Sequence, residues 1–245
     1  MTIKTALSPN FSLKTRKKGD IKFVILHYTG MQSTIESLIR LLDPGSNVSC
    51  HYLIDRKGKI IQMVKEDQIA WHAGKSRWKN LSGMNKKSIG IEIVNKGHLF
   101  GYQKFTKIQI ISLVKLCKKL KKNFSIKTEN FLGHSDIAPL RKTDPGEKFP
   151  WKKLSKYQIG NWYDEKDMIK ILHINQHKKN TIKNFFFKNL HKIGYRYFNL
   201  KKRKKTDFLI VKAFQRRYLP NEVTGKINQK TLKMSNFLAK KQQNS

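Results

Sequence analysis

The segment from residue 131 to 151, FLGHSDIAPLRKTDPGEKFPW, constrains the fold more than any other part of the chain. Two glycines and three prolines interrupt it, so neither a helix nor a strand can run through it. The loop that this predicts is rich in ionisable side chains, among them His134, Asp136, Lys142, Asp144 and Glu147. Such a loop is either a solvated surface turn or a functional site, and its context must decide between them.

Two predicted strands carry polar side chains among apolar ones. Residues 23–26 are apolar without alternation, which is typical of a strand covered on both faces, and His27 ends that strand. Ligands bind outside the carboxyl ends of strands in open α/β sheets. In residues 88–95, SIGIEIVN, the isoleucines share one face and Glu92 lies on the other. A lone carboxylate on a central strand is costly unless it is paired or liganded, so Glu92 is a site candidate.

The first part of the chain predicts an α/β domain. Ser33 or Thr34 caps a short helix, and Thr106 caps a longer one. With a hairpin over 50–64 and a strand near 130–132, the order β-α-ββ-β-α-β predicts a mixed central β-sheet flanked by helices. The inward stripes that we expect are Ile35, Leu38, Ile39 and Leu42 in the first helix, and Ile108, Ile111, Val114 and Cys117 or Leu116 in the second.

The last third of the chain predicts a second unit. Residues 168–245 hold twenty lysines and arginines against two acids, and this shift in composition marks a boundary near residues 160–180, after a linker around 155–167. We therefore expect domains at 1–160 and 175–245. Three amphipathic runs predict a small C-terminal three-helix module: Ile182–Ile193, Asp207–Tyr218 and Asn228–Leu238.

The net charge of +36 suggests a polyanionic partner, such as nucleic acid, an anionic membrane or an acidic wall polymer. However, only nine of the 52 basic residues are arginine, the residue on which base readers and phosphate clamps rely. A general bias toward lysine explains much of the charge, so we expect no specific nucleic-acid partner.

No apolar run approaches the roughly 18 residues of a membrane span, so we expect no transmembrane segment. No secretory signal is visible either, which predicts a cytoplasmic protein, or a periplasmic or outer-membrane one if a signal was removed. Cys50 and Cys117 imply no disulfide framework, and we expect buried free thiols.

Three residues could hold one catalytic zinc ion. Catalytic zinc takes three protein ligands and keeps one open position, and His27, His134 and Asp144 could supply the ligands. A strand-end histidine alone is more often structural than a ligand. The set becomes persuasive together with Glu92 and Lys142, because a zinc hydrolase needs a carboxylate to accept a proton from water and a cation to hold the developing oxyanion.

Six motifs in order resemble one family. They are LHYT at 26–29, SCHYLID at 49–55, AWHAG at 70–74, SIGIEIVN at 88–95, GHSDIAP at 133–139 and RKTDPGEKFPW at 141–151. Together they resemble the zinc-dependent N-acetylmuramoyl-L-alanine amidases of the type 2 amidase family, which also includes the peptidoglycan recognition proteins. The likeness is greatest to the anhydromuramyl-peptide amidases of the AmiD/AmpD kind.

The resemblance implies the type 2 amidase fold and assigns roles to the candidate residues. It makes His27, His134 and Asp144 the zinc ligands, Glu92 the general base and Lys142 the transition-state stabiliser. It also places a second set around the cleft as substrate-binding residues, namely His51, Tyr52, Trp71, His72 and Asn95. For Trp71 and His72, packing is the competing interpretation, and Asp136 is expected to cap a turn. We interpret four further histidines as surface residues: His98, His173, His177 and His191.

The C-terminal segment VKAFQRRYLP, followed by TGKINQKTL, resembles a peptidoglycan-binding three-helix module. The usual core is present as Ala213-Phe214-Gln215, but the usual Asp-Gly before the last helix is replaced by Thr224-Gly225. The predicted domains are therefore a zinc amidase at 1–160 and a peptidoglycan-binding-like helical domain at 175–245.

The expected function is hydrolysis of the amide bond between N-acetylmuramic acid, or its 1,6-anhydro form, and L-alanine, in cell-wall turnover and recycling. Peptidoglycan or muropeptides are the expected partner, and the chain is expected to be a monomer. The alternative is a non-catalytic peptidoglycan-recognition protein on the same fold. Such proteins lack a metal ligand, whereas this sequence retains all three candidates.

Overall fold

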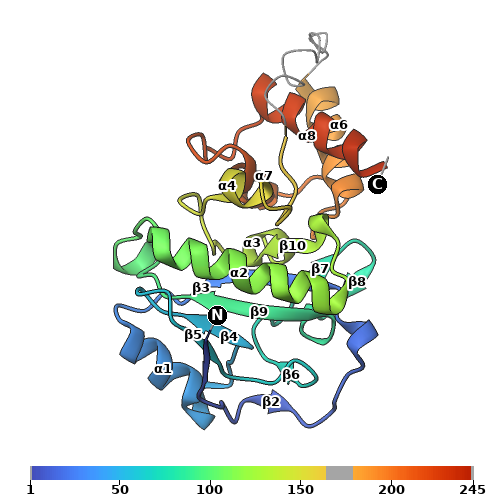
Figure 1. The fold of residues 1–245 in the computed structure, drawn as a ribbon. Helices are drawn as coiled ribbons and strands as arrows, with labels where there is room; N and C mark the ends of the chain where they lie inside the picture. The colour runs from blue at the N-terminus through green and yellow to red at the C-terminus, as the bar shows by residue number, and fades with distance from the viewer. Residues whose placement is uncertain (1, 164–178, 244–245) are drawn as a thin grey trace.

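The fold is built on a mixed β-sheet in the computed structural model, which describes residues 2–163 and 179–243. Within these ranges the sheet has six strands (Figure 1), in the order β1 (Ile3–Thr5), β5 (Ile60–Gln62), β4 (Tyr52–Ile54), β9 (Ser88–Ile93), β3 (Phe23–Tyr28) and β10 (Phe131–Gly133). The pair β4–β5 is antiparallel and every other neighbouring pair is parallel, which confirms the predicted mixed sheet. Two short antiparallel pairs are β2 (Phe11–Ser12) with β6 (Ile69–Ala70), and β7 (Arg77–Trp78) with β8 (Leu81–Ser82).

The described α-helices are α1 (Thr34–Leu42), α2 (Lys107–Phe124), α3 (His134–Ile137), α4 (Trp151–Ser155), α6 (Lys179–Ile193), α7 (Asp207–Tyr218) and α8 (Gln229–Gln243). Both predicted caps are present, because Ser33 Oγ accepts from the Glu36 N–H and Thr106 Oγ1 accepts from the Gln109 N–H, each at 3.1 Å. None of the helices in the described ranges is both long and apolar enough to span a membrane.

Different parts of the chain cover the two faces of the sheet. The isoleucines of β9 pack with Val24 and Leu26 of β3 under α2, which crosses one face of the sheet (Figure 1). On the opposite face, α1 packs near β4 and β5, whereas the C-terminal helices pack on β3 and β10. His27 and Glu92 alternate with the residues under α2, so they lie on this second face, between the two apolar clusters. The fold thus leaves a polar strip in the middle of one sheet face.

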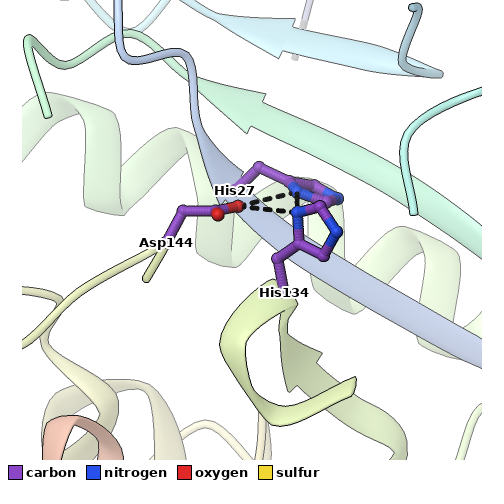
Figure 2. Close-up of side chains that lie close together, drawn as sticks. All are labelled: His27, His134 and Asp144. Atoms are coloured by element: carbon purple, nitrogen blue, oxygen red, sulfur yellow. Dashed lines mark hydrogen bonds and ion pairs between the residues drawn. The ribbon is translucent and has the colours of Figure 1, made fainter. Parts of the chain in front are cut away.

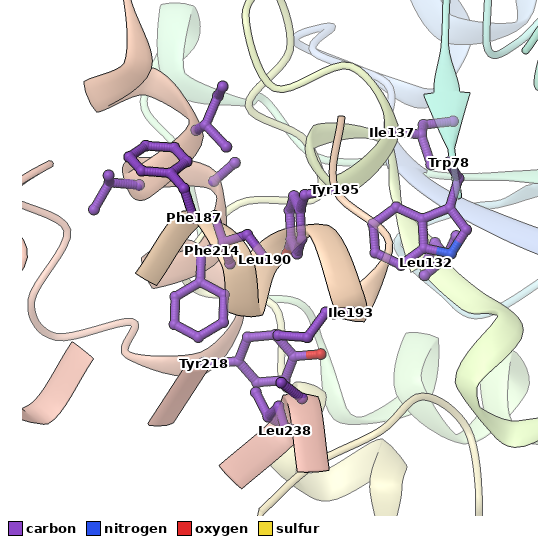
Figure 3. Packing of buried hydrophobic residues seen from close by; sticks show 14 of the residues in the cluster. Trp78, Leu132, Ile137, Phe187, Leu190, Ile193, Tyr195, Phe214, Tyr218 and Leu238 are labelled. Carbon is purple, nitrogen blue, oxygen red and sulfur yellow. The ribbon is translucent and has the colours of Figure 1, made fainter. Parts of the chain in front are cut away.

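The C-terminal helices share one apolar core with the sheet. Ile25 and Leu132 belong to the same buried cluster as Tyr195 and Phe214. Figure 3 shows Leu132, Tyr195 and Phe214 among the side chains of this cluster. Helices α6, α7 and α8 confirm the three helical runs that the sequence predicts. The end of the predicted linker, the start of the predicted second domain, His173 and His177 lie outside the described residues, so the division into two domains stays a prediction.

The inward faces predicted for α1 and α2 are partly wrong. Ile35 and Ile39 of α1 are 69% and 63% exposed, and Ile108 and Ile111 of α2 are each 51% exposed. Both helices carry apolar residues on more than one side, so the position of the sheet decides which side is buried. The buried apolar residues are Leu41 in α1, and Ile110, Leu113, Val114, Leu116, Cys117 and Leu120 in α2. Cys50 and Cys117 are buried free thiols, as predicted.

Candidate metal centre

The three predicted zinc ligands come from three different elements and meet at one point. His27 lies near the end of β3, His134 begins α3 directly after β10, and Asp144 lies in the following loop (Figure 2). His27 Nδ1 is 3.0 Å from His134 Nδ1 and 2.9 Å from Asp144 Oδ2, and His134 Nδ1 is 3.1 Å from the same carboxylate oxygen. All three side chains are buried. The parallel pairing of β10 with β3 brings the two histidines together, because Gly133 is the register partner of Leu26.

The second nitrogen of His134 is held by the backbone. His134 Nε2–H donates to the carbonyl of Ala73 at 3.1 Å. A neutral imidazole carries one N–H, so this bond leaves the His134 Nδ1 lone pair pointing at Asp144.

A longer chain of hydrogen bonds fixes His27 in the same way. Ser88 Oγ–H donates to the Met84 carbonyl at 2.7 Å, so the hydroxyl accepts from His72 Nε2–H at 3.3 Å. His72 Nδ1 then accepts from His27 Nε2–H at 3.1 Å. Because the Met84 carbonyl can only accept, each hydrogen bond of this series donates toward it. His27 therefore carries its proton on Nε2, and its Nδ1 lone pair is free. His72 is thus a supporting residue of a proposed ligand, a role that the sequence did not indicate.

The three groups therefore fit a zinc ion. Two imidazole lone pairs and a carboxylate oxygen face one another, and this arrangement needs positive charge between them, from a metal ion or from a proton on one imidazole. Tetrahedral zinc with ligands near 2.0–2.1 Å places neighbouring ligand atoms about 3.3 Å apart. The observed spacings of 2.9–3.1 Å are within a few tenths of this value. Burial and the neighbouring His134 lower the pKa of His27 to about 4, so its imidazole is neutral and able to coordinate at pH 7.

Glu92 and Lys142 lie beside this centre. Glu92 on β9 is the register partner of His27 on β3, so both side chains project from the same sheet face. Burial, reinforced by the charge of Asp144 and opposed by Lys142, raises the pKa of Glu92 to about 8. Its Oε2 atom is buried without a hydrogen-bond partner among the described residues. A carboxylate that is free to accept a proton near neutral pH has the properties of a general base.

A cleft of about 530 Å³ opens over the centre. Trp71 and His72, both predicted to bind substrate, line it together with Glu92, His134, Lys142 and Asp144. Its rim also includes Tyr28, Arg40, His98, Leu99 and Arg141. The volume lies within the range of small-molecule sites, about 300–1,000 Å³.

The other three predicted substrate contacts lie in the interior of the part of the chain that the structure describes. His51 is buried, accepts from the Gly90 N–H at 2.9 Å and lies 2.8 Å from Arg16. Tyr52 is buried and donates to Glu66. Asn95 is buried and braces the loop that follows β9. The predicted substrate contacts His51, Tyr52 and Asn95 are therefore buried structural residues, because their motifs border the cleft but their side chains do not reach its surface.

His98 lies at the cleft, although the sequence indicated an ordinary surface residue. Its ring stacks on Tyr102 with centroids 4.5 Å apart, and it bonds the Tyr28 hydroxyl at 2.9 Å and Glu147 at 3.0 Å. Its place in the loop after β9, the strand that carries Glu92, is the signal that could have identified it. His191 is exposed, as predicted.

Replacement of Gly90 by alanine tests the support of His27. A Cβ atom at Gly90 would lie 2.3 Å from the His72 ring, so Gly90→Ala must displace His72 and break its bond to His27. We expect zinc affinity to fall about 10–100-fold, as when other outer partners of metal ligands are lost. The measurement is zinc titration against a competing chelator. Gly19→Ala is the control, because a Cβ there has no described atom within 4 Å, and equal affinity of Gly90→Ala and wild type would contradict the assignment.

The sequence also matches known proteins. The family profile for N-acetylmuramoyl-L-alanine amidase matches residues 17–147. Over 171 residues the chain is 38% identical to N-acetylmuramoyl-L-alanine amidase AmiD of Escherichia coli. The matched region covers 63% of this chain and 61% of AmiD, so the chain spans less than two thirds of the length of AmiD. It is 32% identical to 1,6-anhydro-N-acetylmuramyl-L-alanine amidase AmpD of Haemophilus influenzae, over 60% of this chain and 86% of AmpD.

Two solved structures resemble nearly the whole chain. One is the complex of Escherichia coli AmiD with the substrate anhydro-N-acetylmuramic acid-L-Ala-D-gamma-Glu-L-Lys, with a TM-score of 0.81 and 30% identity over 94% of this chain and 92% of that chain. The other is AMPDH3 of Pseudomonas aeruginosa in complex with anhydromuramic pentapeptide, with a TM-score of 0.82 and 28% identity over 95% of this chain and 96% of that chain. At this coverage the likeness includes the C-terminal helices.

Proposed function

Because the chain belongs to the N-acetylmuramoyl-L-alanine amidase family, we propose that it is a zinc hydrolase that cleaves the amide bond between N-acetylmuramic acid, or its 1,6-anhydro form, and L-alanine. One observation carries the proposal: two histidine lone pairs and a carboxylate converge within 3.1 Å beside a cleft that is also lined by Glu92 and Lys142. These groups are a ligand set, a base and a cation.

Each of these residues has a separate role in the proposed hydrolysis. Zinc held by His27, His134 and Asp144 would polarise the amide carbonyl and make water more acidic. Glu92 accepts a proton from the attacking water and passes it to the nitrogen of the leaving L-alanine, so the products are a lactyl carboxylate and a free amine. Lys142 stabilises the negative charge that develops on the carbonyl oxygen.

The names of the relatives favour muropeptides as substrates, and we propose that the chain acts in cell-wall turnover and recycling. AmiD and AMPDH3 were solved with anhydromuramyl peptides, and the cleft has a volume suited to a ligand of that kind. A non-catalytic recognition protein is disfavoured, because all three ligand candidates, Glu92 and Lys142 are present together. The peptidoglycan-binding role of the C-terminal helices and a monomeric state remain predictions.

Digestion of a muropeptide tests the proposal. Purified protein with one equivalent of zinc should release the L-alanyl peptide from an anhydromuramyl tripeptide, as followed by mass spectrometry. A chelator should abolish the release and added zinc should restore it, because the proposed chemistry requires the metal. Failure to release peptide from both anhydromuropeptides and intact peptidoglycan, with zinc present, would remove the enzyme assignment.

A further inference from the structure

Asp136 is more than the turn cap that the sequence predicts. It lies in α3, two residues after His134, and its Oδ2 accepts from the Gly133 N–H at 2.8 Å, which confirms the cap. The same carboxylate is buried and meets two side chains from the C-terminal helical part: the Tyr195 hydroxyl donates to Oδ1 at 2.5 Å, and Arg217 forms a short ion pair with Oδ2. These partners are 59 and 81 residues away in the sequence.

We infer that Tyr195 and Arg217 are positioning residues for the metal centre, acting on His134 through Asp136. The C-terminal helices would then complete the metal centre, in addition to any role that they have in binding the cell wall. This inference rests on the proposed zinc site.

Arg217 is fixed on several sides. Its guanidinium is buried, donates to the Phe131 carbonyl of β10 at 3.0 Å and lies 4.0 Å over the Trp151 ring. Arg217 therefore binds both β10, which directly precedes His134, and the turn that contains His134 and Asp136. Two nitrogens of one buried, planar guanidinium bind Asp136 and Phe131, so the turn and β10 are held by the same rigid group.

Tyr195 also contacts the part of the chain that binds the His134 side chain. Its ring packs edge-on against Trp78 of β7 at 5.1 Å, as Figure 3 shows. The segment before β7 contains Ala73, whose carbonyl accepts from His134 Nε2–H. Tyr195 thus contacts the turn that carries His134, through Asp136, and also β7, which follows the segment that contains Ala73.

The chemistry of this network also favours a positioning role. An aspartate that only caps a turn can do so at the surface, at no cost in desolvation. Burying a carboxylate and a guanidinium together gives little net stability, and one use of such pairs is to fix a geometry. The buried carboxylate of this ion pair, Asp136, lies two residues after the proposed ligand His134.

Paired removal of buried hydroxyls tests the inference. Tyr195→Phe deletes the hydroxyl that bonds Asp136, and Ser235→Ala deletes a buried hydroxyl that bonds Asn189 and Leu232 within the C-terminal helices. Arg217→Lys is the second variant, because it keeps the charge but has a single ammonium for Asp136 and the Phe131 carbonyl. Zinc affinity is measured by chelator competition on the metal-free full chain, together with its melting temperature and the absorption spectrum of the cobalt-substituted protein.

We expect Tyr195→Phe and Arg217→Lys to weaken zinc binding about 10–100-fold and to shift the cobalt spectrum, whereas Ser235→Ala lowers the melting temperature alone. Wild-type affinity in both test variants would overturn the inference and leave the proposed function standing. An equal loss of affinity in Ser235→Ala would also overturn it, because the effect would then be general. A wild-type chain that binds no zinc would overturn the proposed function and this inference together.

Discussion

Glu92→Gln is expected to bind zinc like the wild type and to lose turnover. The side chain keeps its shape, and the ligand atoms of His27, His134 and Asp144 are untouched, so the metal site survives. The amide cannot accept a proton from water, and loss of a general base typically costs about 10²–10⁴-fold in rate. The measurement is the release of L-alanyl peptide by zinc-loaded protein, with zinc content determined on the same sample. Full activity in Glu92→Gln would remove Glu92 from its proposed role.

The stability of the same variant separates a chemical effect from damage to the fold. Burial raises the pKa of Glu92 to about 8, above the ordinary glutamate value of 4.5. A raised carboxyl pKa means that folding favours the protonated form, so the wild type loses stability as the pH rises from about 4.5 through 8. Glutamine has no charge to bury. Metal-free Glu92→Gln should therefore become more stable relative to the wild type between pH 5 and pH 8, as measured by urea unfolding. An equal difference between the two proteins at both pH values would contradict this account.

Glu147→Gln is the matched control for both measurements. Glu147 is a partly exposed carboxylate that pairs with His98 at the cleft rim, and interactions with His98 and Arg216 lower its pKa against the effect of burial. Its replacement should leave zinc content unchanged and should not increase stability at pH 8, because its carboxylate is already favoured in the folded state.

The convergence of the three proposed metal ligands could be anticipated from the sequence because it depends on local pattern and strand order. His27 and Glu92 are identified by a strand end and by a lone charge in an apolar strand, and parallel pairing of β3 with β9 makes them neighbours. The loop at 133–146 then supplies His134 and Asp144. The alternation of strands and the breaking of regular structure by glycine and proline identify these residues as candidates, and the family resemblance supplies their roles.

Exposure and long-range contacts could not be predicted in the same way. Tyr52 and Asn95 lie in motifs that border the cleft, but their side chains point into the interior, and a motif does not encode that direction. Tyr195 and Arg217 reach Asp136 from 59 and 81 residues away. Nothing near Asp136 in the sequence indicates that its carboxylate is buried, so the sequence predicts only a turn cap.

Asp144→Asn should abolish zinc binding without unfolding the chain. The two imidazole Nδ1 lone pairs are 2.9 and 3.1 Å from the carboxylate oxygen, and an asparagine NH₂ group at that place can donate to both of them. The substitution therefore satisfies the lone pairs that otherwise require a cation, while it removes the negative ligand. We expect zinc affinity to fall by more than about 100-fold, because loss of a ligand should cost more than loss of a group that only hydrogen-bonds a ligand. Activity should fall to the level of wild-type protein treated with a chelator.

Zinc content after dialysis and cooperative unfolding in urea test this expectation together. The contrast with Glu92→Gln is the decisive feature, because both variants exchange a carboxylate for an amide on the same cleft floor. If Asp144 is a ligand and Glu92 a base, only the first exchange removes the metal, and both remove turnover. A stoichiometric zinc ion in Asp144→Asn, bound as tightly as in Glu92→Gln, would show that the carboxylate is not a ligand and that His27 and His134 bind metal with a different third group.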